Sequence, residues 1–354
     1  PENSKFKSEA VAPTVTNLTA RTGSCATGAL LQAVSAAAHK TTACARPQER
    51  FVVKKEDSMT DSIVNDSLVS NVADLQFRVV TQDTRQSPPL MSGIEHYENF
   101  PVASWLCPPH LRPAIMALYH FARTADDLAD EGDVPAHHRL KDLSEFRADL
   151  NAALNATITT QSTSVRWPRV FTALGHVVAQ YQLPHSLLHD LLDAFEQDVI
   201  YTSIGKGYRD SAELLDYCRR SANPVGRLLL HLYGVQDDAS LAQSDAICTA
   251  LQLINFWQDR SVDLERGRNY LPEGRSLLEE LGFARALMMQ GAPLVHQVAG
   301  RAGWELRAVV QGGLRILDKL DAQHAGHAQE PSAWPRPTLH QLDVVRVLWR
   351  ILWM

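Results

Sequence analysis

The sequence predicts an all-α fold, and three observations support this prediction. Apolar residues recur three or four positions apart through most of the chain after Arg112, proline and glycine fall where these runs begin or end, and no alternating pattern typical of β-strands competes with them. The run from residue 114 to 130 is typical, with apolar positions at Ile115, Leu118, Ala122, Ala125 and Ala129. The chain has 354 residues, 45% of them hydrophobic, which is enough to bury a substantial core.

The same periodicity predicts helices over residues 186 to 201, 212 to 233 and 245 to 265, and another that ends near Asp321. The run from 212 to 233 contains the sequence YCRRSANPVGR, in which Pro224 and Gly226 are expected to kink the helix. A kink would open space beside Tyr217. Alternatively, Tyr217 only packs between helices and bonds a backbone carbonyl.

Composition and charge exclude several classes of protein. A net charge of -6 and a pI near 6.2 do not indicate a nucleic-acid partner. The five cysteines are odd in number and form no CxxC pair, which argues against a disulfide framework or a zinc site and favours a cytoplasmic location. No apolar run reaches the roughly 20 residues that span a bilayer, so any contact with the inner membrane is expected to be peripheral.

Three regions are expected along the chain. Residues 1–90 contain neither Trp nor Tyr and lack helical periodicity, which predicts a mostly disordered extension. Residues 91–330 contain the helical runs and form the predicted functional domain. Residues 331–354 end in VVRVLWRILWM, an amphipathic basic tail. This tail either lies in a bilayer interface or forms a final helix packed on the domain.

The first candidate site is the run TADDLADEGD, which supplies Asp126, Asp127 and Asp130. On a helix, Asp126 and Asp130 lie one turn apart on the same face, and Arg123 precedes them by one turn. Converging carboxylates repel each other unless a cation lies between them, and Mg²⁺ prefers oxygen ligands of this kind. A solvated acidic helix face would produce the same pattern, so this run alone does not decide between the two.

The second candidate site lies in QLINFWQDRSVDLERGRNYLP, where Asn255, Asp259 and Asp263 recur every four residues among large apolar neighbours. Two carboxylate columns can bind more than one Mg²⁺ and stabilise a departing diphosphate, so Asp126, Asp130, Asp259 and Asp263 are the expected catalytic carboxylates. Arginine suits bidentate contact with phosphate, and the candidates are Arg123, Arg268 and either Arg219 or Arg220. A solvated helix face would explain the last two equally well.

These motifs, taken in order, resemble the squalene/phytoene synthase family. The resemblance spans residues 94 to 321 and rests on the run from Tyr119 to Asp130, the YCxxxAxxxG pattern from Tyr217 to Gly226, and the Q-x-x-N-x-x-x-D-x-x-x-D column from Gln252 to Asp263 with Gly267, Arg268, Tyr270 and Pro272 after it. Within the family, HYENFPVASWL, TADDLADEGD and CRRSANPVGRLLLHLYG are most similar to the bacterial members of the hopanoid pathway that form hydroxysqualene.

The resemblance implies a class I isoprenoid synthase fold, a helical bundle with a central cavity, and Mg²⁺-dependent conversion of presqualene diphosphate and water to hydroxysqualene and diphosphate. It implies metal ligands at Asp126, Asp127, Asp130, Asn255, Asp259 and Asp263. It also implies substrate contacts at Tyr119, Arg123, Gln252, Asn255, Arg268 and Tyr270, and a catalytic Tyr217 that guides a proton or stabilises a cation. Residues 99–103 replace a Ser-containing loop of the family, with the nearest hydroxyl at Ser104, and Asp198 faces either the cavity or solvent.

Two other functions remain open. An enzyme of the same fold could condense two prenyl diphosphates into presqualene diphosphate, phytoene or dehydrosqualene. Some relatives are non-catalytic assembly factors of membrane complexes, although such a protein has no need for both aspartate columns. If the chain is an enzyme, other enzymes of squalene synthesis are its expected protein partners.

Overall fold

The computed structural model describes residues 107–130, 134–155, 164–326 and 336–354. The expectations for residues 1–90 and for the loop at 99–104 lie outside these residues. All described residues belong to one compact unit. Its described elements are α2 (Arg112–Asp130), α3 (Ala136–Asn155), α4 (Pro168–Tyr181), α5 (His185–Ser203), α6 (Ser211–Ser221), α7 (Asn223–Leu232), α8 (Asp238–Glu265), α9 (Leu277–Gly291), the 3-10 helix η1 (Ala292–His296), α10 (Gly300–Gly326) and α11 (Gln341–Leu352).

The prediction of an all-α fold is confirmed, and no strand occurs within the described ranges. Side-chain caps explain several helix starts. The Asp210 carboxylate accepts from the backbone N–H of Glu213 at the start of α6, and Asp237 does the same for Ser240 at the start of α8. Because of the Asp237 cap, α8 begins seven residues before the predicted start at 245. Ser276 begins α9 with a capping box.

The predicted helix over residues 212 to 233 is interrupted, as its proline suggested. It forms two helices, α6 and α7, that are separated at Ala222. Pro224 lies at the start of α7, where its missing N–H costs nothing, but within a continuous helix its ring would clash with the carbonyl four residues earlier. The sequence therefore places the break correctly, and Tyr217 lies on the last turns of α6.

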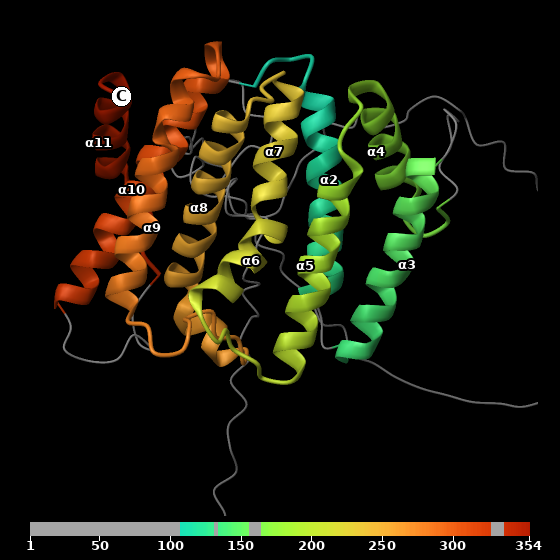
Figure 1. Ribbon diagram of the computed structural model, residues 1–354, viewed down its shortest axis with the longest axis horizontal. Coiled ribbons are helices and arrows are strands. Elements are labelled where there is room, and N and C mark those ends of the chain that lie inside the picture. The colour runs from blue at the N-terminus through green and yellow to red at the C-terminus, as the bar shows by residue number, and fades with distance from the viewer. Residues whose placement is uncertain (1–106, 131–133, 156–163, 327–335) are drawn as a thin grey trace, which may run out of the picture. The chain divides into compact units, whose positions relative to one another are not determined.

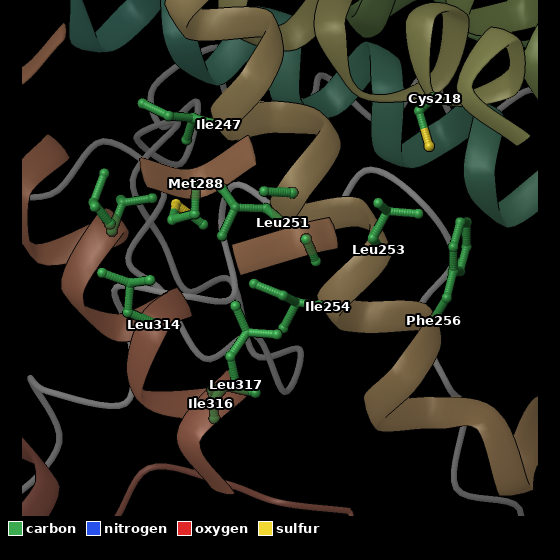
Figure 2. Close-up of a cluster of buried hydrophobic side chains, with 14 of the residues drawn as sticks. Cys218, Ile247, Leu251, Leu253, Ile254, Phe256, Met288, Leu314, Ile316 and Leu317 are labelled. Carbon is green, nitrogen blue, oxygen red and sulfur yellow. The ribbon is translucent and has the colours of Figure 1, made fainter. Parts of the chain in front are cut away.

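Two clusters of buried side chains form the core, and Figure 1 shows the helices from which they come. One joins α2, α3, α4 and α5 and contains four phenylalanines, of which Phe121 and Phe146 stack with ring centroids 5.4 Å apart. The other joins α8, α9 and α10, and Figure 2 shows its side chains meeting between these helices, including Ile247, Leu251, Ile254, Met288, Leu314 and Leu317. Full burial of each such side chain contributes about 1.5–3 kcal/mol.

Helix α11 packs on α10, and Figure 1 shows the pair at one edge of the helical array. Val347 and Ile351 are buried, and the buried carboxylate of Asp343 accepts from Arg315 Nε at 2.7 Å and from the His340 backbone N–H at 2.9 Å. Lys319 Nζ lies 2.5 Å from the same carboxylate. Within the described parts of the chain, no helix has the length and apolar character needed to cross a membrane.

Gly226 permits close approach of α7 and α8, and its replacement tests this packing. A Cβ at residue 226 would lie far inside contact distance of Cys248 Sγ and Ser244 Oγ on α8. Gly226→Ala is therefore expected to lower the free energy of unfolding by about 1–3 kcal/mol in urea denaturation. Gly282→Ala on α9 is the control, because nothing lies within 4 Å of the added Cβ. Equal destabilisation by both variants would contradict this account.

The anchoring of α11 is expected to depend on pH. Burial alone would raise the pKa of Asp343, but hydrogen bonds from Lys319, the His340 backbone and Arg315 lower it below its ordinary value. A lowered carboxyl pKa stabilises the fold above the unfolded pKa of about 3.9 and loses this contribution as pH falls through the folded pKa. Asp343→Asn should cost about 1–3 kcal/mol in urea unfolding at pH 7.

The cost of Asp343→Asn should shrink once pH falls below about 4. Asp142→Asn is the control, because the carboxylate of Asp142 pairs with Arg166 in a more exposed position. That variant should cost less than about 1 kcal/mol at pH 7. An Asp343→Asn cost that is independent of pH would show that the carboxylate charge does not anchor α11.

Candidate active site

The first carboxylate group lies on the last two turns of α2. Arg123 Nη1 is 3.1 Å from Asp126 Oδ2, and Arg123 Nη2 is 2.7 Å from Asp127 Oδ1. Spacings of three and four residues along a helix place these side chains on neighbouring turns, so the contact follows directly from the sequence. Asp126 is only 2% exposed, and its Oδ1 has no hydrogen-bond partner among the described residues. Buried polar atoms normally have a partner, so this carboxylate oxygen is suited to bind a cation or to accept a hydrogen bond from a ligand.

The second group lies on the last turns of α8. Arg336, from the segment before α11, contacts Asp259 in a bidentate arrangement, with Nε 2.5 Å from Oδ1 and Nη2 3.2 Å from Oδ2. Asn255 lies one turn before Asp259 and Asp263 one turn after it, all three half-buried. Gln258 Nε2 also donates to the carbonyl of Pro337 at 2.8 Å. The segment that leads into α11 is therefore fixed against this column by two residues of α8.

The turn after α8 brings further basic residues to α2. Gly267 adopts φ 76°, a left-handed conformation that favours glycine. The backbone N–H groups of Arg266 and Arg268 donate to the carbonyl of Asp263 at 3.0 and 2.8 Å, which folds the chain back on the helix end. Arg268 then forms a close ion pair with Asp130, and Arg266 Nη1 lies 3.6 Å from the same carboxylate.

Helix α5 contributes polar groups from a third direction. Thr202 Oγ1 accepts from Arg268 Nε at 3.3 Å. The buried Asp198 carboxylate accepts from the Tyr270 hydroxyl, with distances of 3.0 Å to Oδ1 and 3.2 Å to Oδ2. Of the two sequence interpretations of Asp198, exposure to solvent is therefore wrong. Arg268 thus joins α2 to α5, and Tyr270 joins α5 to the segment after α8.

A cluster of aromatic rings adjoins this polar region. The Tyr270 ring stacks on Phe256 of α8, with centroids 3.7 Å apart and planes at 7°. The buried ring of Tyr217 lies 6.3 Å from that of Tyr270 and 6.1 Å from that of Phe256. Tyr208 completes the cluster at 5.8 Å from Tyr217. Aromatic faces attract positive charge, so this cluster can stabilise a cation beside the carboxylates.

Gln252 occupies an unusual position within α8. Its side chain is fully buried, and neither atom of its amide has a hydrogen-bond partner among the described residues. An orphaned amide inside a protein costs about 1–3 kcal/mol, which a well-packed apolar side chain would avoid. Gln252 therefore fits a role in contacting a ligand better than a role in packing.

The concentration of carboxylates changes their acidity. Burial raises the pKa of Asp126 well above its ordinary value, with Asp130 among the neighbouring carboxylates that add to the effect. Burial and then the charge of Asp259 raise the pKa of Asp263 to about 7. Burial also raises the pKa of Asp259, and the Arg336 guanidinium offsets this only in part. Burial is the first cause of each shift, so the charged form of these carboxyl groups is favoured only when further positive charge is added nearby.

These carboxylates fit Mg²⁺ by their chemistry, although guanidinium groups now contact them. Within the described residues, no group of three or more His, Cys, Asp or Glu side chains is arranged to bind a metal ion. The donors are nevertheless all oxygen, come from two helices, include the orphaned Asp126 Oδ1, and lie in an environment that favours added positive charge. A metal ion would take the place of at least one arginine.

Sequence reasoning placed some residues here and missed others. For Arg219 the structure favours the solvated helix face, since its side chain is exposed and pairs with Asp216 on the same helix. Arg220 also pairs with Asp216, but its side chain is only 16% exposed and donates to Gln197 Oε1 of α5, so it does not lie on a solvated face. Tyr119 lies half-buried on α2, against the first core cluster. Arg336 was not foreseen, because it lies 77 residues from Asp259 in a proline-containing stretch with no pattern of its own. The sequence analysis also missed Tyr208, although it singled out Tyr217 and Tyr270, whose rings lie beside that of Tyr208.

Comparison with known proteins agrees with this arrangement. The family model described as squalene/phytoene synthase matches residues 95–280, which include every site residue above except Arg336. A hydroxysqualene synthase of Zymomonas mobilis is 38% identical over 209 residues, which cover 58% of this chain and 64% of that protein. A hydroxysqualene synthase of Rhodopseudomonas palustris is 38% identical over 259 residues, which cover 66% of this chain and 83% of that protein.

A solved structure gives the same result at the level of the fold. The crystal structure of squalene synthase HpnC from Alicyclobacillus acidocaldarius superposes with a TM-score of 0.57 at 33% sequence identity. The match covers 65% of this chain and 90% of that one.

The hydrogen bond between Tyr270 and Asp198 is testable by a single substitution. Tyr270→Phe retains the ring stacked on Phe256 but removes the donor to a buried carboxylate, so the free energy of unfolding should fall by about 1–3 kcal/mol in urea denaturation. Tyr181→Phe is the control, because its hydroxyl bonds the His110 carbonyl at 3.4 Å in an exposed position. The control should change stability by less than about 0.5 kcal/mol, and similar costs for both variants would contradict this account.

Proposed function

This chain belongs to the squalene/phytoene synthase family, and we propose that it converts presqualene diphosphate and water into hydroxysqualene and diphosphate. Membership confirms the predictions of an isoprenoid synthase fold and of an enzyme of this family. The finer assignment is supported by the two relatives named hydroxysqualene synthase. The observation that carries it is the convergence of carboxylates, arginines and aromatic rings from α2, α5, α6 and α8.

The acidic and basic groups suit a diphosphate with its metal ions. Asp126 and Asp130 on α2, and Asp259 and Asp263 on α8, would bind Mg²⁺, with Asp127 and Asn255 beside them. Bound Mg²⁺ would neutralise charge on the diphosphate oxygens. The guanidinium groups that now contact these carboxylates include those of Arg123, Arg268 and Arg336. Each would be released from a carboxylate to contact phosphate oxygens, for which the planar guanidinium is well shaped.

The aromatic cluster suits the hydrocarbon part of the substrate. When the carbon–oxygen bond to diphosphate breaks, the bonding electrons leave with the diphosphate and a carbocation remains. The rings of Tyr217, Tyr208 and Tyr270 offer negative faces to that cation while excluding bulk water. One water molecule then adds through its oxygen and loses a proton, which balances the reaction without a reductant. The buried amide of Gln252 is a group that could orient substrate or water.

The experiment is incubation of purified full-length protein with Mg²⁺ and either presqualene diphosphate or farnesyl diphosphate, without NADPH, followed by mass spectrometry. Hydroxysqualene is expected from presqualene diphosphate and should disappear when EDTA removes the metal. Asp259→Asn should lower the rate by roughly a hundredfold or more, because it weakens the stabilisation of the leaving group.

The matched control is Asp245→Asn on the same helix. Asp245 pairs with Arg227 fourteen residues before Asp259, so the rate should be unchanged. A condensed C30 or C40 product from farnesyl or a longer prenyl diphosphate would replace the proposal with the condensation reaction. A folded protein that releases no diphosphate from any of these substrates would favour a non-catalytic role.

A further inference from the structure

Helix α11 buries only a narrow stripe against α10. Asp343, Val347 and Ile351 are buried and recur every four residues, so they form one line along the helix. The ion pairs of Asp343 with Arg315 and Lys319 fix this stripe to α10. The contact accounts for one side of the helix and leaves the opposite side without a role in packing on α10.

The opposite side is apolar as well. We define the outer face of α11 as six residues that are each between 54% and 80% exposed, namely Leu342, Val345, Leu348, Trp349, Leu352 and Trp353. Trp349 and Trp353 lie one turn apart, with ring centroids separated by 5.9 Å. Soluble monomers rarely expose a contiguous apolar patch, and a patch of this kind usually marks a binding surface.

Basic residues border the outer face on one side. At 100° per residue, Arg346 falls next to Trp353 and Leu342 around the helix, and Arg350 falls next to Arg346. Both arginines are exposed, and Arg350 Nη1 lies 3.6 Å from Asp318 of α10. Paired tryptophans, aliphatic residues and a basic border together match the chemistry of an anionic lipid interface.

We propose that the outer face of α11 docks on the surface of an anionic lipid bilayer. In this pose the two tryptophans enter the interfacial region and Arg346 contacts lipid phosphates. A second copy of this chain is a poorer partner for the outer face. Two-fold pairing of α11 with itself would place Arg346, near the middle of the helix, close to its counterpart and set like charges against each other.

Docking would place the candidate active site close to the lipid. The segment from residue 336 to 340 connects Arg336, which contacts Asp259, with the start of α11. The contact of Gln258 with Pro337 ties the same segment to α8. If the chain acts on a prenyl diphosphate, as proposed above, its hydrocarbon substrate resides in the membrane, and this short segment links the docked helix directly to the second aspartate column. That consequence rests on the proposed function, whereas lipid binding by the outer face does not.

The test is cosedimentation of full-length protein with phosphatidylcholine vesicles prepared with and without phosphatidylglycerol. The protein should bind the anionic vesicles. Trp349→Ser combined with Trp353→Ser should weaken binding by roughly tenfold or more, because it removes the largest apolar groups of the outer face. Arg346→Glu should remove the preference for phosphatidylglycerol. Leu278→Ser is the control, since Leu278 is similarly exposed, at 55%, on α9.

Three results would overturn the proposal. These are an absence of vesicle binding by the unmodified protein, binding that the double tryptophan variant retains in full, and a dimer in sedimentation velocity that the same variant dissociates. Thermal melting of each variant verifies that α11 remains folded. Activity on substrate dispersed in detergent should be the same for the double variant and the unmodified protein. The two proposals can therefore fail separately: lipid docking can be refuted while the proposed reaction is confirmed, and the reaction can be refuted while lipid docking is confirmed.

Discussion

Repulsion among buried carboxylates is the constraint on which the rest of this structure depends. Helices α2, α5 and α8 each direct aspartates into one region, and each buried negative charge opposes folding unless a positive charge lies near it. Arg123 supplies that charge locally on α2, whereas Arg268 and Arg336 reach their partners across long stretches of sequence. The arginines therefore help to fix the turn after α8 and the segment before α11. Burial raises the pKa of Asp126 and of Asp263 even with arginines nearby, so the arginines offset the cost of burying these carboxylates only in part.

Partial compensation of buried charge connects stability with function. A buried ion pair contributes little net stability, since the cost of desolvation cancels most of the attraction, so carboxylates of this number are poor tools for holding helices together. The orphaned oxygen of Asp126 and the orphaned amide of Gln252 add further cost. A ligand that pairs with these buried carboxylates and with the Gln252 amide would remove these energetic costs and so stabilise the folded protein. Metal ions with a diphosphate would do so, because they bring positive charge and many oxygen atoms together.

The sequence predicted what depends on neighbours along the chain. Helical periodicity located the helices, Pro224 located the kink that separates α6 from α7, and helical spacing placed Arg123 one turn before Asp126, which it contacts. It could not predict pairings set only by tertiary structure. Asp198 and Tyr270 lie 72 residues apart, and nothing in their local sequence connects them. Arg336 is a stronger case, because only the path of the chain beyond α10 brings it to Asp259.

Helix α11 shows why an amphipathic pattern can carry two meanings. From the sequence, its apolar residues fit a helix packed on the domain and equally a helix lying on a membrane. In the structure these alternatives are compatible, because the buried stripe of Val347 and Ile351 uses only one side of the helix and the tryptophans occupy the other. A helix that is apolar on two opposite sides can join two surfaces at once. Helix α10 occupies one of these sides. Periodicity alone could not predict which surface binds the opposite side, but the arginines that border it favour a negatively charged surface.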